Sequence, residues 1–141
     1  MRFTSLAKVR FSEVDRAGIV YFPRFLNYFH VAFEDFFDQY LGTPYADVIT
    51  QEGFAFPAVR TEVDFKKPLR FGELMEIEVA IEEIGRKSCR FRYTLRVKGD
   101  EEVRAVGRVT SVAVEMAGFT SIPIPDKYRR LFEAYLAQQG E

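Results

Sequence analysis

Apolar residues recur along this chain with two different periods, and the change of period outlines the elements it predicts. From Pro23 to about Leu41 they return every three or four positions, which is typical of one face of an α-helix. Pro23 suits the first helical position, so Phe22 is the predicted N-cap. The segment 42–44, Gly-Thr-Pro, ends the helix. The apolar face is unusually aromatic and consists of Phe22, Phe25, Leu26, Phe29, Phe33, Phe36, Phe37 and Tyr40.

Elsewhere apolar and polar residues alternate, which predicts strands with one buried face. A short first run surrounds Val9 and Phe11 and breaks at residues 13–18. Four further strands follow. The second and third of these pair as an antiparallel hairpin through Gly85, because one polar face is rich in glutamate and the other in arginine. The four strands span residues 59–66, 75–82, 89–98 and about 103–115, with short helices at 45–52 and 125–138.

This order of elements is a strand, a long helix, four strands and a short helix. It predicts an α+β fold in which an antiparallel sheet of about five strands covers one long helix. No internal repeat, low-complexity tract or interdomain linker interrupts the chain. We therefore expect a single domain over residues 1–141. Periodicity alone does not distinguish between α+β folds of this kind.

Charge and composition narrow the class of protein. The 20 Lys and Arg nearly balance the 21 Asp and Glu, which argues against a nucleic-acid partner. One cysteine, Cys89, permits no internal disulfide, and one histidine, His30, leaves no credible zinc set, so we expect no metal. The apolar segment 19–41 carries too many charges for a membrane span, and residues 1–20 hold no signal-peptide core. We expect a soluble, cytoplasmic protein without a membrane partner.

The segment 15–25, Asp-Arg-Ala-Gly-Ile-Val-Tyr-Phe-Pro-Arg-Phe, resembles the signature of the 4-hydroxybenzoyl-CoA thioesterase-like family of hotdog-fold acyl-CoA thioesterases. That signature places an aspartate, a glycine and two aromatic residues just before the central helix. The similarity covers nearly the whole chain, with weaker patches at 85–88 and 124–128. It implies the hotdog fold, a curved sheet wrapped around a central helix. It also implies a homodimer whose sheets join edge to edge, and then a homotetramer, and unpaired sheet edges make such association physically reasonable.

For the chemistry, the resemblance implies hydrolysis of acyl-CoA thioesters by Asp15 and the backbone N–H of Phe22. The carboxylate would attack the thioester or activate water, and the N–H at the start of the helix would stabilise the oxyanion. Whether Asp15 acts as a nucleophile, through an anhydride, or as a general base stays open. Without the resemblance, an aspartate before a helix is usually a cap or turn residue.

Aromatic residues near the start of the predicted helix indicate which kind of acyl group the site would bind. Tyr21, Phe25 and Phe29 suit the wall of a site for a flat aryl group, although core packing explains Phe25 and Phe29 equally well. The stretch 29–34, Phe-His-Val-Ala-Phe-Glu, is similar to one in the 1,4-dihydroxy-2-naphthoyl-CoA hydrolase branch of the family. This similarity implies that His30 contacts substrate, and a helix-surface residue is the alternative.

Coenzyme A carries several phosphates, so a nearly neutral protein needs local positive charge to hold it. Arg86, Lys87 and Ser88, in the predicted turn after Gly85, are the candidates, and the resemblance places nucleotide contacts there. Because coenzyme A is part of the substrate, we expect no separate cofactor. A non-catalytic acyl-CoA-binding module, a thioesterase for acyl carrier protein and a hotdog hydratase remain alternatives.

Overall fold

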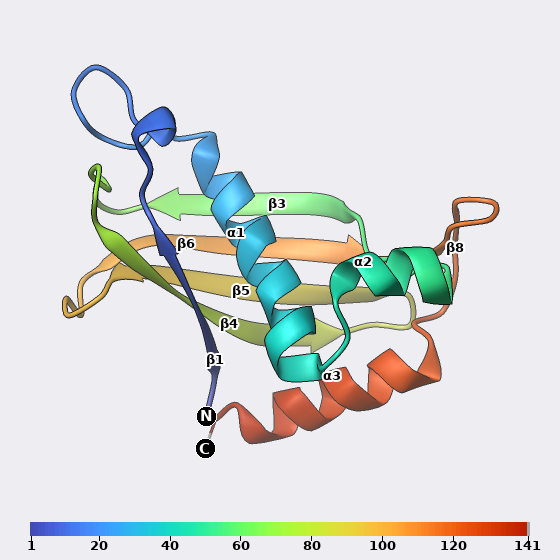
Figure 1. Cartoon of the computed structure of the whole chain (residues 1–141). Helices are drawn as coiled ribbons and strands as arrows, with labels where there is room; N and C mark the ends of the chain where they lie inside the picture. The colour runs from blue at the N-terminus through green and yellow to red at the C-terminus, as the bar shows by residue number, and fades with distance from the viewer. Residues whose placement is uncertain (141) are drawn as a thin grey trace.

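The computed structural model describes residues 1–140 and contains a five-stranded antiparallel sheet that curves around a long helix (Figure 1). The strand order is β1-β4-β5-β6-β3, so β1 and β3 form the two edges. The predicted hairpin is present, and Glu76 lies opposite Arg96 in it. The strands of this sheet are β1 (Phe3–Lys8), β3 (Ala58–Phe65), β4 (Leu74–Ile84), β5 (Ser88–Val97) and β6 (Val103–Val112).

The long helix, α1 (Arg24–Asp35), crosses the inner face of the sheet (Figure 1). It continues through a wider π-helical segment, η2 (Phe36–Leu41), to Gly42. Gly42 has a φ of 84°, the left-handed conformation in which glycine commonly ends a helix, as predicted. The sheet, the helix and their order confirm the predicted α+β hotdog fold. The side chains that the helix buries are Phe25, Tyr28, Phe29, Ala32, Phe33, Phe36 and Phe37.

Alternate residues of neighbouring strands share rows on the inner face of the sheet. In one row Tyr93 lies opposite Val79 on one side and Gly107 on the other, and Gly107 lies opposite Val63. The inward residues of β4 and β5 are buried, whereas β3 is exposed along nearly its whole length, with Val63 half-buried. Alternation therefore predicts this strand but not its exposure, because the single chain places little against the β3 end of the sheet.

The C-terminal helix, α3 (Asp126–Gln138), closes one side of the core by burying Tyr128, Phe132 and Tyr135. The amino group of Met1 donates to the carbonyl of Gln138 at 2.9 Å, so the two ends of the chain lie together (Figure 1). Within residues 1–140 no helix combines the length and apolarity needed to cross a membrane. The remaining elements are η1 (Phe11–Glu13), α2 (Tyr45–Asp47), η3 (Val48–Glu52), β2 (Phe54–Ala55), β7 (Val114–Glu115) and β8 (Thr120–Ser121).

The prediction of a first strand around Val9 and Phe11 is wrong, because β1 ends at Lys8. Val9 is buried in the bend that follows, and Phe11 starts a short 3₁₀ turn in which its side chain is exposed. In β1 itself the buried Ser5 donates its hydroxyl to the Asp35 carboxylate at 2.5 Å. This polar residue on the inner face interrupts the apolar alternation and hides the strand from periodicity.

The outer face of the sheet carries a network of paired charges. The carboxylate of Glu82 accepts hydrogen bonds from Arg90, Arg92 and Arg108, at 3.1, 3.1 and 3.2 Å. Burial favours the neutral form of Glu82, but Arg108 and Arg92 outweigh this effect and hold the pKa of the carboxyl below its usual range. The network ties β4, β5 and β6 together on the side of the sheet away from α1.

Candidate active site

Asp15 lies in a narrow loop that folds back on itself before α1. Its N–H donates to the carbonyl of Ile19 at 2.8 Å, and its carboxylate Oδ1 accepts the N–H of Ala17 at 2.8 Å. The side chain is exposed, and within residues 1–140 the second oxygen, Oδ2, has no hydrogen-bond partner. Asp15 therefore has the turn role that its sequence position suggests, and this role leaves one carboxylate oxygen free.

The start of α1 presents one free backbone donor. The helix begins at Arg24 with Pro23 as N-cap, one residue later than predicted. The N–H groups of residues 24–26 are not free, since they donate to the carbonyls of residues 21–23, and the Tyr21 N–H also has an acceptor. Proline has no N–H, so in the described chain Phe22 has the one unpaired N–H of this segment.

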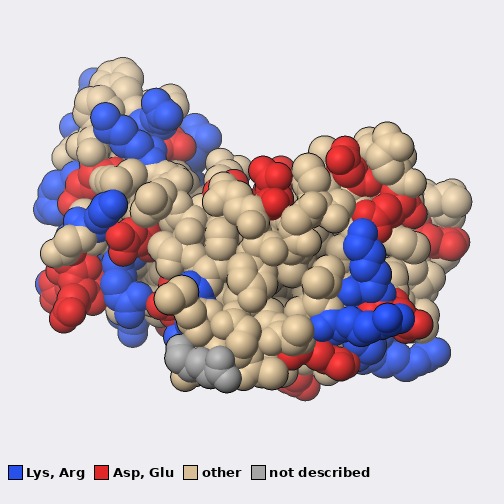
Figure 2. Space-filling view, turned by 60° about the horizontal axis from the view of Figure 1, so that its bottom comes forward, with Lys and Arg blue, Asp and Glu red and all other residues tan. Residues whose placement is uncertain are grey.

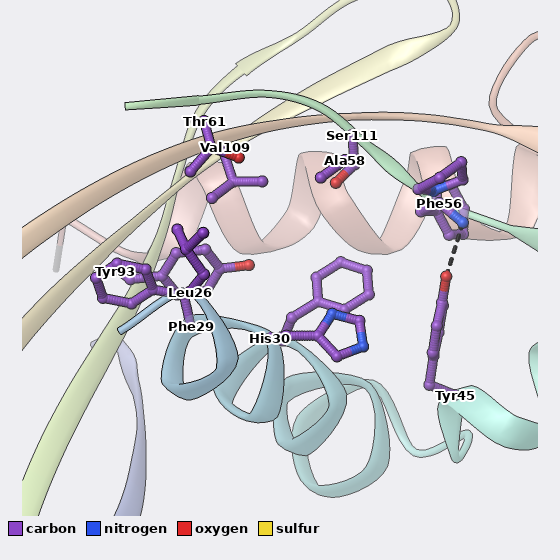
Figure 3. Close-up of a pocket in the computed structure, with 12 residues that line it drawn as sticks. Leu26, Phe29, His30, Tyr45, Phe56, Ala58, Thr61, Tyr93, Val109 and Ser111 are labelled. Carbon is purple, nitrogen blue, oxygen red and sulfur yellow. Dashed lines mark hydrogen bonds between the residues drawn. The ribbon is translucent and has the colours of Figure 1, made fainter. Parts of the chain in front are cut away.

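A cavity of about 280 Å³ opens between α1 and the sheet (Figure 3). Leu26, half-exposed on its rim, lies in the first turn of α1, four residues after Phe22. Tyr45 bounds the cavity on the α2 side, where its hydroxyl accepts the N–H of Phe56 at 2.8 Å. Aromatic walls come from Phe29, Phe33 and Phe56, and the polar side chains that face the space are His30, Thr61, Tyr93 and Ser111.

Phe29 lies flat on the sheet because Gly107 leaves room for it. The Phe29 ring stacks on Tyr93, with centroids 5.5 Å apart and planes 15° apart. A Cβ on Gly107 would lie 2.7 Å from the Cδ2 atom of Phe29, closer than side-chain carbons pack. Phe29 is 1% exposed and also lines the cavity, so it is both a core residue and a wall of the predicted acyl site.

His30 lies at the mouth of the cavity. Its side chain is 56% exposed, and its Nε2 lies 3.2 Å from the carboxylate of Glu34, one helical turn away. The imidazole also stacks on Phe33, with ring centroids 5.8 Å apart. These contacts orient His30 between the cavity and solvent, and contact with substrate stays a prediction.

Two of the predicted wall residues lie outside this cavity. Phe25 is 3% exposed and packs edge-on against Phe65 and Tyr28, at 5.1 and 5.9 Å between ring centroids, so core packing describes it best. Tyr21 is exposed and rests beside the ring of Phe22 at the start of the helix. The structure therefore separates the four predicted aryl contacts, and two of them, Phe29 and His30, line the cavity.

The predicted coenzyme A contacts lie in the β4–β5 turn. A backbone hydrogen bond of 2.7 Å links Gly85 N–H to the Ser88 carbonyl, and the guanidinium of Arg129 donates to two carbonyls of the turn. Lys87 donates to a serine of β8 at 3.2 Å, while exposed Arg86 has no ion-pair partner among residues 1–140. Figure 2 shows Lys and Arg side chains, with Asp and Glu among them, at the end of the molecule where this turn and the start of α3 lie, and further Lys and Arg at the opposite end.

One chain does not bring all the predicted site residues together. The loop with Asp15 lies at one end of the sheet, and the turn with Arg86 lies at the other (Figure 1). Asp15 lines an open hollow with Phe11 and Phe71, separate from the cavity along α1. A site that uses both the carboxylate and the basic turn would therefore combine two copies of the chain.

Other reactive groups are few in the described chain. No group of three or more His, Cys, Asp or Glu side chains in residues 1–140 is arranged to hold a metal ion. Cys89 is fully buried, and burial raises the pKa of its thiol, which fits the core role predicted from its inward position. The sequence does not identify Tyr93 or Ser111 as site residues. The signal they carry is a hydroxyl at an inward position of a strand that is otherwise apolar.

Comparisons with known proteins identify the family. Residues 9–132 match the model of the thioesterase-like superfamily. A 1,4-dihydroxy-2-naphthoyl-CoA hydrolase from Nostoc punctiforme is 31% identical over 127 residues, which cover 90% of this chain and 84% of the relative. A solved gentisyl-coenzyme A thioesterase is 28% identical with a TM-score of 0.81, covering 90% of this chain and 99% of its own. A thioesterase superfamily structure from Jannaschia sp. CCS1 is 26% identical with a TM-score of 0.89, and the match covers 96% of this chain and 93% of the Jannaschia chain. Together with the sheet that wraps α1, these matches show that the chain belongs to the thioesterase-like superfamily of hotdog proteins.

Proposed function

We propose that this chain hydrolyses the thioester bond of an aromatic acyl-CoA, releasing the free acid and coenzyme A. The observation that carries the proposal is the aromatic-walled cavity along α1, whose lining residue Leu26 lies four residues after Phe22 and its unpaired N–H. A flat acyl group in this cavity would leave its carbonyl close to that N–H. Relatives named for 1,4-dihydroxy-2-naphthoyl-CoA and gentisyl-CoA support the same substrate class here.

In this mechanism Asp15 supplies the carboxylate and Phe22 supplies the oxyanion donor. Attack on the thioester carbon moves an electron pair onto the carbonyl oxygen, and the N–H at the positive end of α1 stabilises that charge. Asp15 either attacks directly, forming an anhydride that water then hydrolyses, or takes a proton from the attacking water. The tetrahedral intermediate collapses by expelling the coenzyme A thiolate, which takes up a proton. Coenzyme A arrives as part of the substrate, and these steps use no further cofactor.

The proposed assembly is a homodimer that joins through β3 and pairs further into a homotetramer. β3 is an edge strand, and its side chains Val59 and Phe65 are 62% and 50% exposed. An open apolar edge of this kind favours pairing with a second strand. Assembly also gives the proposed site its missing part, because Arg86 of a second copy can approach Asp15 of the first. We place the protein in the cytoplasm, where acyl-CoA esters are made and used.

Release of free thiol from a panel of aryl- and alkyl-CoA esters tests the activity. The unmodified chain should turn over aryl-CoA esters steadily. Asp15→Asn should lower kcat by at least about 100-fold, because general acid–base groups contribute about 10²–10⁴, while calorimetry should still detect substrate binding. Asp38→Asn is the matched control, since Asp38 is exposed on η2, away from the loop and the cavity.

Three results would contradict the proposal in different ways. Substrate binding without turnover by the unmodified chain would make it an acyl-CoA-binding module. Undiminished turnover by Asp15→Asn would remove Asp15 from the mechanism. Turnover of acyl carrier protein thioesters alone would replace the substrate class.

Arg86→Ala tests the basic turn. Loss of one charge-assisted contact should raise KM for CoA esters by about tenfold, and it should not affect truncated thioesters that lack the nucleotide. Arg90→Ala, which removes a paired arginine from the outer face, should leave both classes unchanged. Equal losses for full and truncated substrates in Arg86→Ala would show that the turn does not bind phosphate.

A further inference from the structure

Two hydroxyl groups of the described chain face the cavity along α1 without a hydrogen-bond partner. As whole residues Tyr93 is 2% exposed and Ser111 is 3% exposed, and within residues 1–140 neither hydroxyl makes a hydrogen bond. Figure 3 shows the Tyr93 hydroxyl directed into the space between α1 and the strands that carry Thr61 and Ser111. Neither oxygen is among the fully buried unpaired side-chain atoms of residues 1–140, so both hydroxyls are open to the cavity and can pair with a polar group that enters it.

The surroundings of the two hydroxyls suit a flat aromatic ring. Phe29 and Phe33 line the α1 side, and Val109 lines the sheet between the rows of Tyr93 and Ser111. Gly107 lies opposite Tyr93 on β6, and it precedes Ser111 by four residues, so the two positions are about 13 Å apart along the strand. The cavity is thus a slot with apolar faces and a polar group toward each end.

We propose, on the basis of the proposed function, that the hydroxyls of Tyr93 and Ser111 recognise hydroxyl substituents on an aromatic acyl group bound in this cavity. The thioester carbonyl would lie at the Leu26 rim, near the Phe22 N–H, and the substituted part of the ring would point inward. Tyr93 would contact a hydroxyl on the ring nearer the rim, and Ser111 one that lies deeper.

The chemistry of the two side chains fits this role. A hydroxyl both donates and accepts, so it pairs with a ring hydroxyl in either direction. Burial raises the pKa of Tyr93 well above the usual value, so its hydroxyl stays protonated and available as a donor at neutral pH. A site built around hydroxyls rejects a ring that lacks them, because its buried groups then stay unpaired.

Matched substrate pairs test the inference. The pairs are 4-hydroxybenzoyl-CoA with benzoyl-CoA, and 1,4-dihydroxy-2-naphthoyl-CoA with 2-naphthoyl-CoA. The unmodified chain should favour the hydroxylated member of at least one pair by tenfold or more in kcat/KM. Tyr93→Phe or Ser111→Ala should reduce that preference by about five- to tenfold, mainly through loss of activity on the hydroxylated member.

Tyr128→Phe is the control, since it removes a tyrosine hydroxyl from a fully buried ring outside the cavity and should leave the preference unchanged. Equal hydrolysis of both members of each pair by the unmodified chain would overturn this inference and leave the proposed thioesterase intact. Unchanged preference in both cavity variants would also overturn it.

If no ester is hydrolysed, the proposed function fails, and calorimetry with 1,4-dihydroxy-2-naphthoate and 2-naphthoate decides the inference. Tighter binding of the hydroxylated acid that is lost in Tyr93→Phe supports the inference, and equal binding ends it.

Discussion

Substituting Gly107 by alanine should force Phe29 off the sheet. An added Cβ would lie 2.7 and 2.9 Å from the Cδ2 and Cζ atoms of Phe29 and nearer still to Cε2. Carbon atoms pack at about 3.5–4.0 Å, so the ring would have to retreat by roughly 1 Å. Phe29 is stacked on Tyr93 and held in the core, and therefore it cannot turn aside freely.

The expected cost follows from two opposing effects. Overpacking a core costs about 1–3 kcal/mol, and removing a glycine from a strand returns about 0.5–1 kcal/mol. The net loss should be about 1–2 kcal/mol. For 141 residues the entropy of unfolding is about 0.3 kcal/mol per kelvin, so Gly107→Ala should lower Tm by about 3–7 °C.

Thermal unfolding of a double-mutant cycle checks the mechanism. Phe29→Leu shortens the side chain above Gly107, so it should relieve the alanine, and the double variant should be at least about 1 kcal/mol more stable than the two single losses predict. Gly140→Ala is the control, since no atom lies within 4 Å of its Cβ position. An unchanged Tm for Gly107→Ala, or strictly additive losses in the double variant, would refute the argument that glycine makes room for the ring.

Two further predictions concern stability. Burial raises the pKa of Tyr135 to about 12, and its hydroxyl accepts the Phe3 N–H and donates to the Val79 carbonyl. Because the tyrosine pKa is about 10 in the unfolded chain, this stabilisation is complete below pH 10 and is lost as pH rises towards 12, by up to about 3 kcal/mol. Urea unfolding should therefore show a steeper alkaline decline for the unmodified chain than for Tyr135→Phe, and parallel curves would contradict it. Phe119 is exposed and has a φ of 51°, so Phe119→Gly should stabilise the β7–β8 turn by about 0.5–1 kcal/mol, and a lower Tm would contradict this.

The sequence predicts the elements whose residues repeat without interruption. The strand at 89–98 and the helix from Pro23 to Leu41 each carry one apolar face, and the structure places both within one or two residues of the predicted bounds. β1 escapes prediction because Ser5 occupies an inward position, where it pairs with the end of α1 instead of packing as an apolar residue. A hydrophobic pattern identifies buried positions only where the side chains are apolar. It does not identify a buried polar side chain, such as Ser5, whose hydrogen bond is made within the protein.

The sequence likewise predicts some residues of the candidate site and not others. The spacing of Asp15 and Phe22 can be read from the chain, because a loop and a helix start are local. Tyr93 and Ser111 could not be found in this way, since a hydroxyl facing a cavity and one facing a packed core occupy the same position in a strand pattern. Which inward position borders an empty space depends on how Phe29 packs against β6, and that is a property of tertiary structure.

The eight residues of β3 leave one side of their backbone without a strand partner in the described chain. Where copies pair there, burial of apolar surface is completed by association, so resistance to unfolding rises with protein concentration. Dilution, or a proline placed in this strand, would separate the copies and leave the edge free to template unrelated strands. In the proposed assembly, separated copies would therefore aggregate, and activity lost on dilution would indicate dissociation of the copies rather than a defect in the active site.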